Sequence, residues 1–339
     1  MNTIAVLGAG GWGTALAVHL ARTGKTVRLW ARDETLAHEL ARRRVNAVYL
    51  PAVALPDGVS PTASMDEALW RADCVVAAVP SHGARQVLRR AARLVAPGAI
   101  VVSAAKGLES GTLLRMSQVI EQELGDARRV VVLSGPSFAL EVARGAPTAV
   151  CVAGESPRAV TVLQEEFRSA YFRLYGTDDV IGVEMGGALK NVIAIAAGVV
   201  EALGLGHNAL SALITRGLAE LSRLACAVGG RRETLAGLSG LGDLVLTCTG
   251  ELSRNRRVGI ELGRGRSLAQ ILEPMKMVAE GVRTTGAALE LGVRYHVELP
   301  IAAQMADVLA GRKAPRAGVE ELMLRPQRSE PDGVEELRA

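Results

Sequence analysis

Aromatic residues are scarce in this chain of 339 residues, which contains three Phe, four Tyr and three Trp. Proteins that bind single-stranded nucleic acids stack bases on aromatic side chains, and they follow the backbone with clustered basic residues. The net charge of +4 comes from interspersed residues of both signs, with no long basic block. We therefore expect a small anionic ligand and no nucleic-acid partner.

Cysteine is also rare, and none of Cys74, Cys151, Cys226 and Cys248 forms a C-x-x-C pair. Each lies in an apolar run, which predicts buried thiols in a reducing compartment. The N-terminus shows no cationic segment followed by a signal-type apolar stretch. The uncharged apolar run at 192–200 is shorter than the ~18 residues of a membrane span. We expect a cytoplasmic protein that has no membrane segment.

Lysine is the rarer cation, with five lysines against 34 arginines. Lys190 lies in the run 184–198, which has the pattern of a helix that is apolar on nearly every side and therefore buried. A buried ammonium is costly unless it meets a counter-charge or releases its proton. Lysine can release a proton where arginine cannot, so Lys190 is a candidate proton carrier. The alternative, a packed stem with its ammonium in water, stays open on this stretch alone.

The chain begins with a predicted strand, Thr3–Leu7, followed by a glycine-rich segment and a helical pattern. Gly8, Gly10 and Gly13 form the spacing G-x-G-x-x-G. The first glycine allows a tight turn, the second lets the backbone approach a pyrophosphate, and the third allows close packing of helix and strand. The N–H groups at the helix start then hold the anion. A dinucleotide site is favoured over an ordinary glycine-rich turn.

The second strand is predicted at Thr26–Trp30, and no acidic residue for a ribose hydroxyl stands at its end. Arg32 instead is placed to face a 2′-phosphate, whereas Asp33 fits the N-cap of a helix at Glu34–Arg43. This favours NADPH or tolerance of both cofactors. The alternative for Arg32 is a solvated loop residue.

Continuously apolar runs separated by helical patterns predict a parallel, doubly wound sheet. The helical patterns include 112–124 and Pro157–Phe167. The predicted fold is α/β, with an N-terminal Rossmann-like, mostly parallel sheet and an all-α C-terminal domain. The further strands are expected at 74–79, 100–104, 130–133 and 149–153.

Polar residues follow several of these strands: the Gly8 loop, Arg32, Ser81, Lys106 and Ser137. The carboxyl ends of parallel strands share one edge of a sheet, and ligands bind there. Lys106 is therefore expected at a ligand-facing edge, in preference to an ordinary surface loop.

The alternation of strands and helices stops near residue 182, and helical patterns, including 208–228, continue to about residue 324. We expect a dinucleotide-binding domain at 1–179 and a helical substrate-binding domain at 180–325. The charged tail at 326–339 has few apolar residues and is expected to be loose.

Two motifs of the helical half carry polar groups. Asp243 stands in an apolar, glycine-flanked run and needs a partner if buried; Lys190 is the candidate, and a helix N-cap is the alternative. Ser253, an N-cap candidate, precedes Arg254, Asn255 and two further arginines. Donors clustered at a helix start suit a phosphate, although a solvated basic turn is the alternative.

In their order and spacing, these motifs resemble the bacterial-type NAD(P)-dependent glycerol-3-phosphate dehydrogenases over about residues 3–325. Members of that family reduce dihydroxyacetone phosphate to sn-glycerol 3-phosphate with NADP(H) or NAD(H), for phospholipid synthesis. The matching stretches read GAGGWGTALA, VPSH, AAKGLE, SGPSFALEVA, IGVEMGGALKNVIAIAAG, LITRGLAE, GLGDLVLTCT, SRNRRVG and VAEGVRT.

The resemblance implies roles for individual residues, with Lys190 as the proton donor and acceptor, Lys106 as a second catalytic residue near the nicotinamide, and no metal. The implied cofactor contacts, besides the motif glycines, are Gly11, Trp12, Arg32, Lys106, Ala139, Arg254, Val278 and Glu280. The implied substrate contacts are Lys106, Gly135, Ser137, Lys190, Asp243, Ser253, Arg254 and Asn255.

Two other functions remain open at this point. One is a two-domain β-hydroxyacid dehydrogenase, which also uses a helix lysine but takes a carboxylate substrate. The other is a non-enzymatic NADP(H)-sensing module, which needs neither the buried lysine nor the SRNRR helix start. The sequence leaves the oligomeric state open, with a homodimer as one option.

Overall fold

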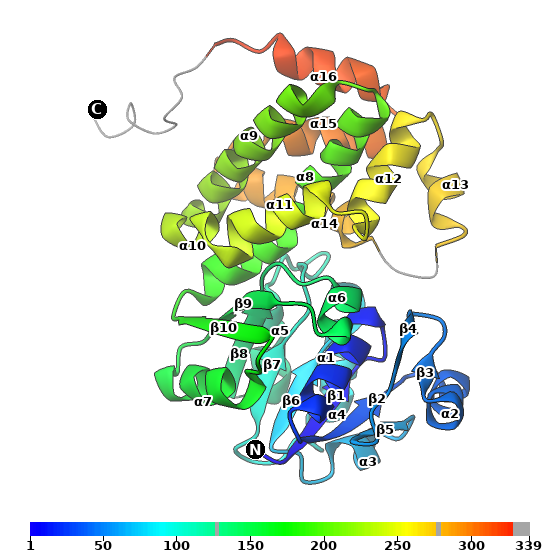
Figure 1. Ribbon diagram of the computed structural model, residues 1–339. Helices are drawn as coiled ribbons and strands as arrows, with labels where there is room; N and C mark the ends of the chain where they lie inside the picture. The colour runs from blue at the N-terminus through cyan, green and yellow to red at the C-terminus, as the bar shows by residue number, and fades with distance from the viewer. Residues whose placement is uncertain (126–128, 276–278, 328–339) are drawn as a thin grey trace.

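The computed structural model describes residues 1–125, 129–275 and 279–327. It contains an α/β part built on an eight-stranded sheet, with a helical part stacked on it (Figure 1). The strand order is β10-β9-β8-β7-β6-β1-β2-β5. The strands span β1 Thr3–Leu7, β2 Thr26–Trp30, β5 Val59–Thr62, β6 Cys74–Ala77, β7 Ile100–Ser103, β8 Val130–Ser134, β9 Thr148–Ala153 and β10 Phe172–Thr177.

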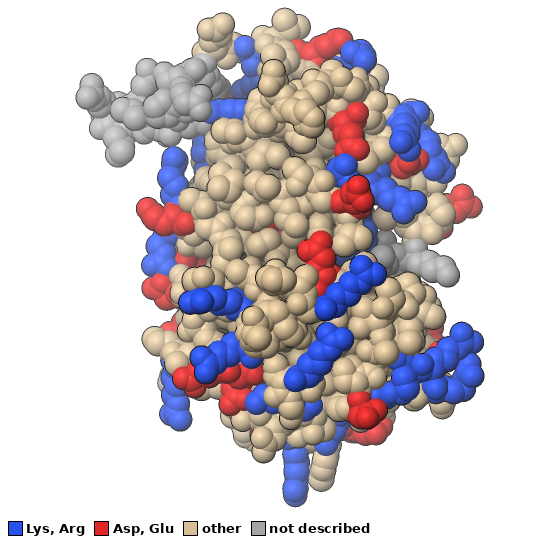
Figure 2. Space-filling view, viewed as in Figure 1, with Lys and Arg blue, Asp and Glu red and all other residues tan. Residues whose placement is uncertain are grey.

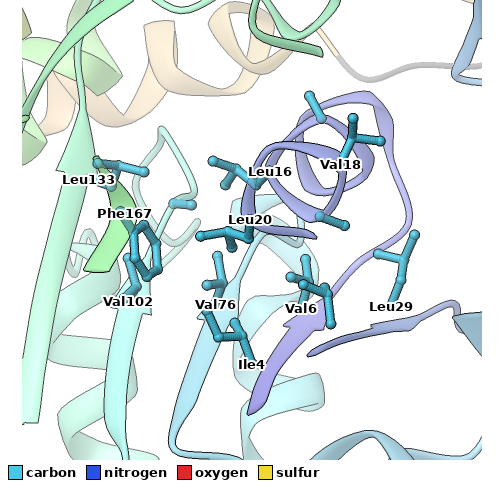
Figure 3. Close-up of a cluster of buried hydrophobic side chains, with 14 of the residues drawn as sticks. Ile4, Val6, Leu16, Val18, Leu20, Leu29, Val76, Val102, Leu133 and Phe167 are labelled. Atoms are coloured by element: carbon cyan, nitrogen blue, oxygen red, sulfur yellow. The ribbon is translucent and has the colours of Figure 1, made fainter. Parts of the chain in front are cut away.

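Helices cover both faces of this sheet, as the doubly wound prediction requires. Figure 3 shows Leu16 and Leu20 of α1 packed near Val6 and Val76 of the sheet, with Phe167 beside them. These helices are α1 Gly11–Arg22, α2 Glu34–Arg43, α3 Met65–Leu69, α4 Ser81–Ala91, α5 Met116–Leu124, α6 Ala139–Arg144 and α7 Pro157–Phe167.

The prediction of a parallel sheet is confirmed for β1, β2, β6, β7 and β8 and is wrong for β9, which pairs antiparallel to β8. The parallel edge strand β5 was not predicted. Only the short α6 lies between these two strands, and it stays at the carboxyl edge, packed on α1 and on β4 (Leu50–Ala54). Without a crossover helix, the next strand must return antiparallel. The edge strand β10 was not predicted, because its exposed Arg173 and Tyr175 interrupt the apolar run.

The cysteines are all free, but the prediction that all are buried is only partly right. Cys74 and Cys248 are buried, Cys151 is half-buried, and Cys226 is exposed. Cys226 lies in the last turn of its helix, on the face turned away from the core.

Helix α8 (Val180–Ala202) is the centre of the helical part, and every residue from 182 to 200 is buried. Asp179 caps its start by accepting the N–H of Gly182 at 2.8 Å. The helices around it are α9 Gly206–Ala227, α10 Arg232–Ala236, α11 Asp243–Thr249, α12 Arg254–Gly263, α13 Leu268–Leu272, α14 Glu280–Arg294, α15 Pro300–Leu309 and α16 Pro315–Met323, with a π-helical turn at Leu238–Gly242.

Among the described residues, α8 is also the one helix long and apolar enough to cross a membrane, at a mean hydropathy of 1.5. Its most apolar window is 89% buried inside the protein, as in a core helix. The division into domains at residue 179 stays a prediction. The predicted loose tail lies, apart from residues 326 and 327, outside the described residues.

Helices α8 and α12 cross at backbone contact, which two glycines make possible. A Cβ on Gly259 would lie 1.8 Å from the carbonyl oxygen of Ile195, and one on Gly198 would lie 1.9 Å from that of Arg256. The crossing fixes the N-terminal end of α12, including Ser253, against α8.

We expect Gly259→Ala to lower the free energy of unfolding by about 3 kcal/mol, because the added methyl group overlaps backbone that cannot move aside. Urea denaturation measures the change. Gly286→Ala is the matched control, since a Cβ there meets nothing within 4 Å. Exposed helical glycine costs stability, so the control should be neutral or stabilising. Equal losses in both variants would contradict the argument.

Candidate active site

The glycine-rich loop has the geometry that its spacing predicts. Gly8 has φ +116° and leaves no room for a side chain, because a Cβ would lie 2.7 Å from the carbonyl oxygen of Ala78. A Cβ on Gly13 would lie 1.9 Å from the oxygen of Gly8, whereas one on Gly10 would meet nothing within 4 Å. Gly10 is the N-cap of α1 and Gly11 its first residue. The loop therefore leaves an open approach to the free N–H groups of the α1 start.

The predicted cofactor residues around this loop differ in their burial and in their contacts. Trp12 and Ala139 pack against the same apolar cluster, and the indole nitrogen of Trp12 is buried without a hydrogen-bond partner among the described residues. Arg32 is exposed directly after β2. Asp33 caps α2 by accepting the N–H of Leu36 at 3.0 Å, as predicted. Val278 lies outside the described residues.

Glu280, in the first turn of α14, links the two parts of the protein. Its carboxylate accepts hydrogen bonds from the hydroxyl of Ser81 at 2.7 Å and from the Ser81 N–H at 3.2 Å. Ser81 opens α4, directly after β6, so the helical part contacts the ligand edge of the sheet here. Arg254 is exposed at the start of α12. Desolvation lowers the pKa of its guanidinium, and the negative charge of Glu280 opposes this shift.

Two lysines share one buried carboxylate at the same edge. Asp243, which is 1% exposed, pairs with Lys190 through Oδ1 and with Lys106 through Oδ2 at 2.7 Å. Lys106 also donates to the carbonyl of Gly135 at 2.8 Å and to Ser137 Oγ at 3.5 Å. The structure therefore brings together five of the predicted substrate residues, which come from the loops after β7 and β8 and from α8 and α11.

The predicted pairing of Lys190 with Asp243 is confirmed, and the alternative of an ammonium in water is wrong, since Lys190 is 5% exposed. Burial lowers the pKa of Lys190 to about 7; the Lys106 ammonium also lowers it, while Asp243 opposes the shift. A pKa lowered to near neutral pH suits the predicted role of Lys190 as a proton carrier. The alternative role of Asp243 as an N-cap is wrong, because Gly242 occupies that position.

The start of α12 is built differently from the predicted donor cluster. Ser253 is the N-cap and accepts the N–H of Arg256 at 3.2 Å. Asn255 is buried; its amide nitrogen donates to Asn191 at 2.8 Å, and its oxygen accepts the Gly281 N–H at 3.0 Å. Arg256 pairs with Glu201, so it is not a free donor. Arg254 and Arg257 are the exposed arginines of this group.

Sequence reasoning missed several polar partners in the site. Thr247 Oγ1 accepts a hydrogen bond from Lys190 at 2.9 Å and donates to the Asp243 carbonyl at 2.6 Å. Its spacing of four residues from Asp243 on one helix was the available signal. Asn191 follows Lys190 directly. The contact between Ser81 and Glu280 joins residues too distant in sequence for any local pattern to connect.

A glycine-rich loop after the first strand of a parallel sheet, with a buried lysine pair at the same edge, defines a Rossmann-type NAD(P)-dependent dehydrogenase. Residues 3–160 match the family model "NAD-dependent glycerol-3-phosphate dehydrogenase N-terminus", and residues 179–320 match the corresponding C-terminus model. The chain belongs to the NAD-dependent glycerol-3-phosphate dehydrogenase family, whose members are oxidoreductases.

Relatives match nearly the whole chain. A protein of Koribacter versatilis named glycerol-3-phosphate dehydrogenase [NAD(P)+] is 50% identical, covering 97% of this chain and 99% of its own. The protein of the same name from Acidobacterium capsulatum is 52% identical, and the match covers 97% of this chain and 100% of that protein. The crystal structure of glycerol-3-phosphate dehydrogenase from Coxiella burnetii has a TM-score of 0.91 at 40% identity. The match covers 96% of this chain and 99% of that chain. The roles of individual residues stay predictions.

Proposed function

We propose that the protein reduces dihydroxyacetone phosphate to sn-glycerol 3-phosphate with NADPH or NADH, and catalyses the reverse reaction. The observation that carries this proposal is the buried Lys190–Asp243–Lys106 arrangement at the sheet edge that also bears the Gly8 loop. The names of relatives about 50% identical support it. We further propose that the reaction occurs in the cytoplasm and supplies the backbone of phospholipids.

The chain has the groups that a dinucleotide needs. The open approach at Gly10 and the unpaired N–H groups of the α1 start fit a pyrophosphate. Trp12, Ala139, Glu280 and Arg254 would line the remainder, and Arg32 would face a 2′-phosphate where one is present. When bound, the reduced nicotinamide supplies the hydride.

Lys190 would donate a proton to the C2 oxygen of the substrate, because its Nζ is held by Asp243 and Thr247 and retains one further N–H. Lys106 would stabilise negative charge that develops on the same oxygen. Gly135 and Ser137 hold Lys106 in place. Arg254, with Ser253 and Asn255 at the α12 start, would bind the phosphate, and this remote binding would align C2 for reaction.

The test is consumption of the reduced nicotinamide, followed by its absorbance, with dihydroxyacetone phosphate and each cofactor in turn. A β-ketoacid substrate run in parallel examines the β-hydroxyacid alternative, and it should give no turnover. Tight NADPH binding without any consumption would favour the sensing module and overturn the proposal.

The pH dependence should run in opposite senses for the two directions. Ketone reduction needs protonated Lys190, so kcat/KM should fall as pH rises through about 7; oxidation needs the neutral amine and should rise through the same range. The substrate phosphate, titrating near pH ~6, acts on both directions alike. Rates between about pH 5.5 and 9 check this. A reduction rate with no inflection near 7 would contradict it, because a lysine with the ordinary pKa of 10.5 stays protonated throughout this range.

A further inference from the structure

Asn46 is a fully buried asparagine whose side chain contacts the glycine-rich loop. It lies in β3 (Val45–Asn46), which forms a small antiparallel hairpin with β4, beside α2 in Figure 1. Its amide nitrogen donates to the carbonyl oxygen of Ala9 at 2.9 Å and to Thr14 Oγ1 at 2.8 Å. Asn46 is 0% exposed, so none of these contacts is shared with bulk water.

The orientation of this amide is fixed by a third contact. The oxygen of Asn46 accepts the backbone N–H of Tyr49 at 3.1 Å, and a backbone N–H can only donate. The nitrogen therefore faces Ala9 and Thr14, because the flipped amide would lose its hydrogen bonds with the Ala9 carbonyl and the Tyr49 N–H.

The carbonyl of Ala9 determines where the next N–H points. The first helical hydrogen bond of α1 runs from the Thr14 N–H to the Gly10 carbonyl at 2.9 Å, so the Ala9 carbonyl precedes the helix ladder. In a planar trans peptide, the C=O of Ala9 and the N–H of Gly10 point in opposite directions. Because Asn46 holds the carbonyl inward, the Gly10 N–H points away from Asn46, and a Cβ on Gly10 would meet nothing within 4 Å.

We propose that Asn46 is a positioning residue for the cofactor: its amide donor fixes the Ala9–Gly10 peptide so that the Gly10 N–H is presented to the pyrophosphate. Asn46 has no direct contact with the ligand in this role. The inference rests on the proposed function, because it takes NAD(P)(H) as the ligand of the glycine-rich loop. It assigns to the β3–β4 hairpin a function beyond covering the core.

Two variants separate the donor from other properties of the side chain. Asn46→Asp keeps the acceptor for Tyr49 but removes both donated hydrogen bonds, and Asn46→Leu removes them without adding a charge. We expect each variant to raise the Kd for NADPH by about tenfold or more, since one well-placed hydrogen bond to a charged group is worth about that factor. The kcat at saturating cofactor and the KM for dihydroxyacetone phosphate should stay near the wild-type values.

The matched control is Val53→Ala in β4, which is buried in the same core and has a side chain without any hydrogen-bonding group. It should lower the melting temperature while leaving the NADPH Kd unchanged. If the NADPH Kd rose equally in the control, Asn46 would act only by stabilising the fold in general, and the proposal would be overturned.

Direct NADPH titration without substrate separates this proposal from the proposed function. Wild-type protein that binds no NADPH would overturn both; wild-type binding with unchanged Kd in both Asn46 variants would overturn this inference alone. A weakened Asn46→Asp beside an unchanged Asn46→Leu would mean charge repulsion and also overturn it. If Asn46→Leu does not fold, NADPH is titrated into Asn46→Asp at low and at high salt. A Kd that stays raised at high salt supports the missing N–H, because salt screens charge repulsion but does not restore a hydrogen-bond donor. A Kd that returns to the wild-type value at high salt means repulsion and overturns the inference.

Discussion

Replacing Lys190 by methionine should leave NADPH binding intact and reduce turnover of dihydroxyacetone phosphate by about 10²–10⁴-fold, the usual contribution of a general acid. Methionine preserves much of the packing of the lysine stem within α8, so the loss is confined to the ammonium. Asp243 keeps Lys106 as a counter-charge, and the site avoids an isolated buried carboxylate.

The measurement for Lys190→Met combines NADPH titration with stopped-flow observation of hydride transfer. Lys313→Met is the control, because Lys313 forms ion pairs with Asp307 of α15 and Glu321 of α16, outside the site. That variant should turn over at the wild-type rate. Hydride transfer at near-normal speed in Lys190→Met would show that another group supplies the proton, and the proposed mechanism would be wrong.

The fold could be predicted from sequence wherever one local rule decides the structure. Thr3–Leu7, Thr26–Trp30 and Pro157–Phe167 have the predicted bounds, because apolar runs and helix caps are local signals. The direction of β9 could not be predicted in this way. It depends on α6 remaining at the carboxyl edge against α1, which is a tertiary contact between distant segments.

The residues of the site also divide into those that the sequence predicted and those that it did not. Lys190 and Asp243 are each conspicuous alone, as charged residues in apolar runs, so their pairing followed from the cost of burying either one. The position of Lys106 on the other oxygen of Asp243 did not follow, because strand ends predict an edge and not a partner. Asn46 gave no signal at all, since one asparagine directly before a tight turn is an ordinary turn residue.

Asp243→Asn should affect activity as severely as the loss of Lys190, but with a different pH response. Removing the carboxylate leaves two ammonium groups without their shared counter-charge, which costs about 3–5 kcal/mol of stability for a buried pair. The attraction that raises the pKa of Lys190 is lost while the repulsion from Lys106 remains, so this pKa falls further below about 7. At neutral pH the proton donor is then largely uncharged, and ketone reduction slows.

Lowering the pH reprotonates Lys190 in Asp243→Asn, so reduction should recover about tenfold for each unit of pH until the new pKa is reached. Lys190→Met has no such group and should show no recovery, which separates a displaced proton donor from a missing one. Asp178→Asn is the control, because that carboxylate is exposed and pairs with Arg231 away from the lysines. If Asp243→Asn instead kept the wild-type pH profile at reduced rate, Asp243 would act through substrate placement, and Lys190 would owe its proton affinity to other groups.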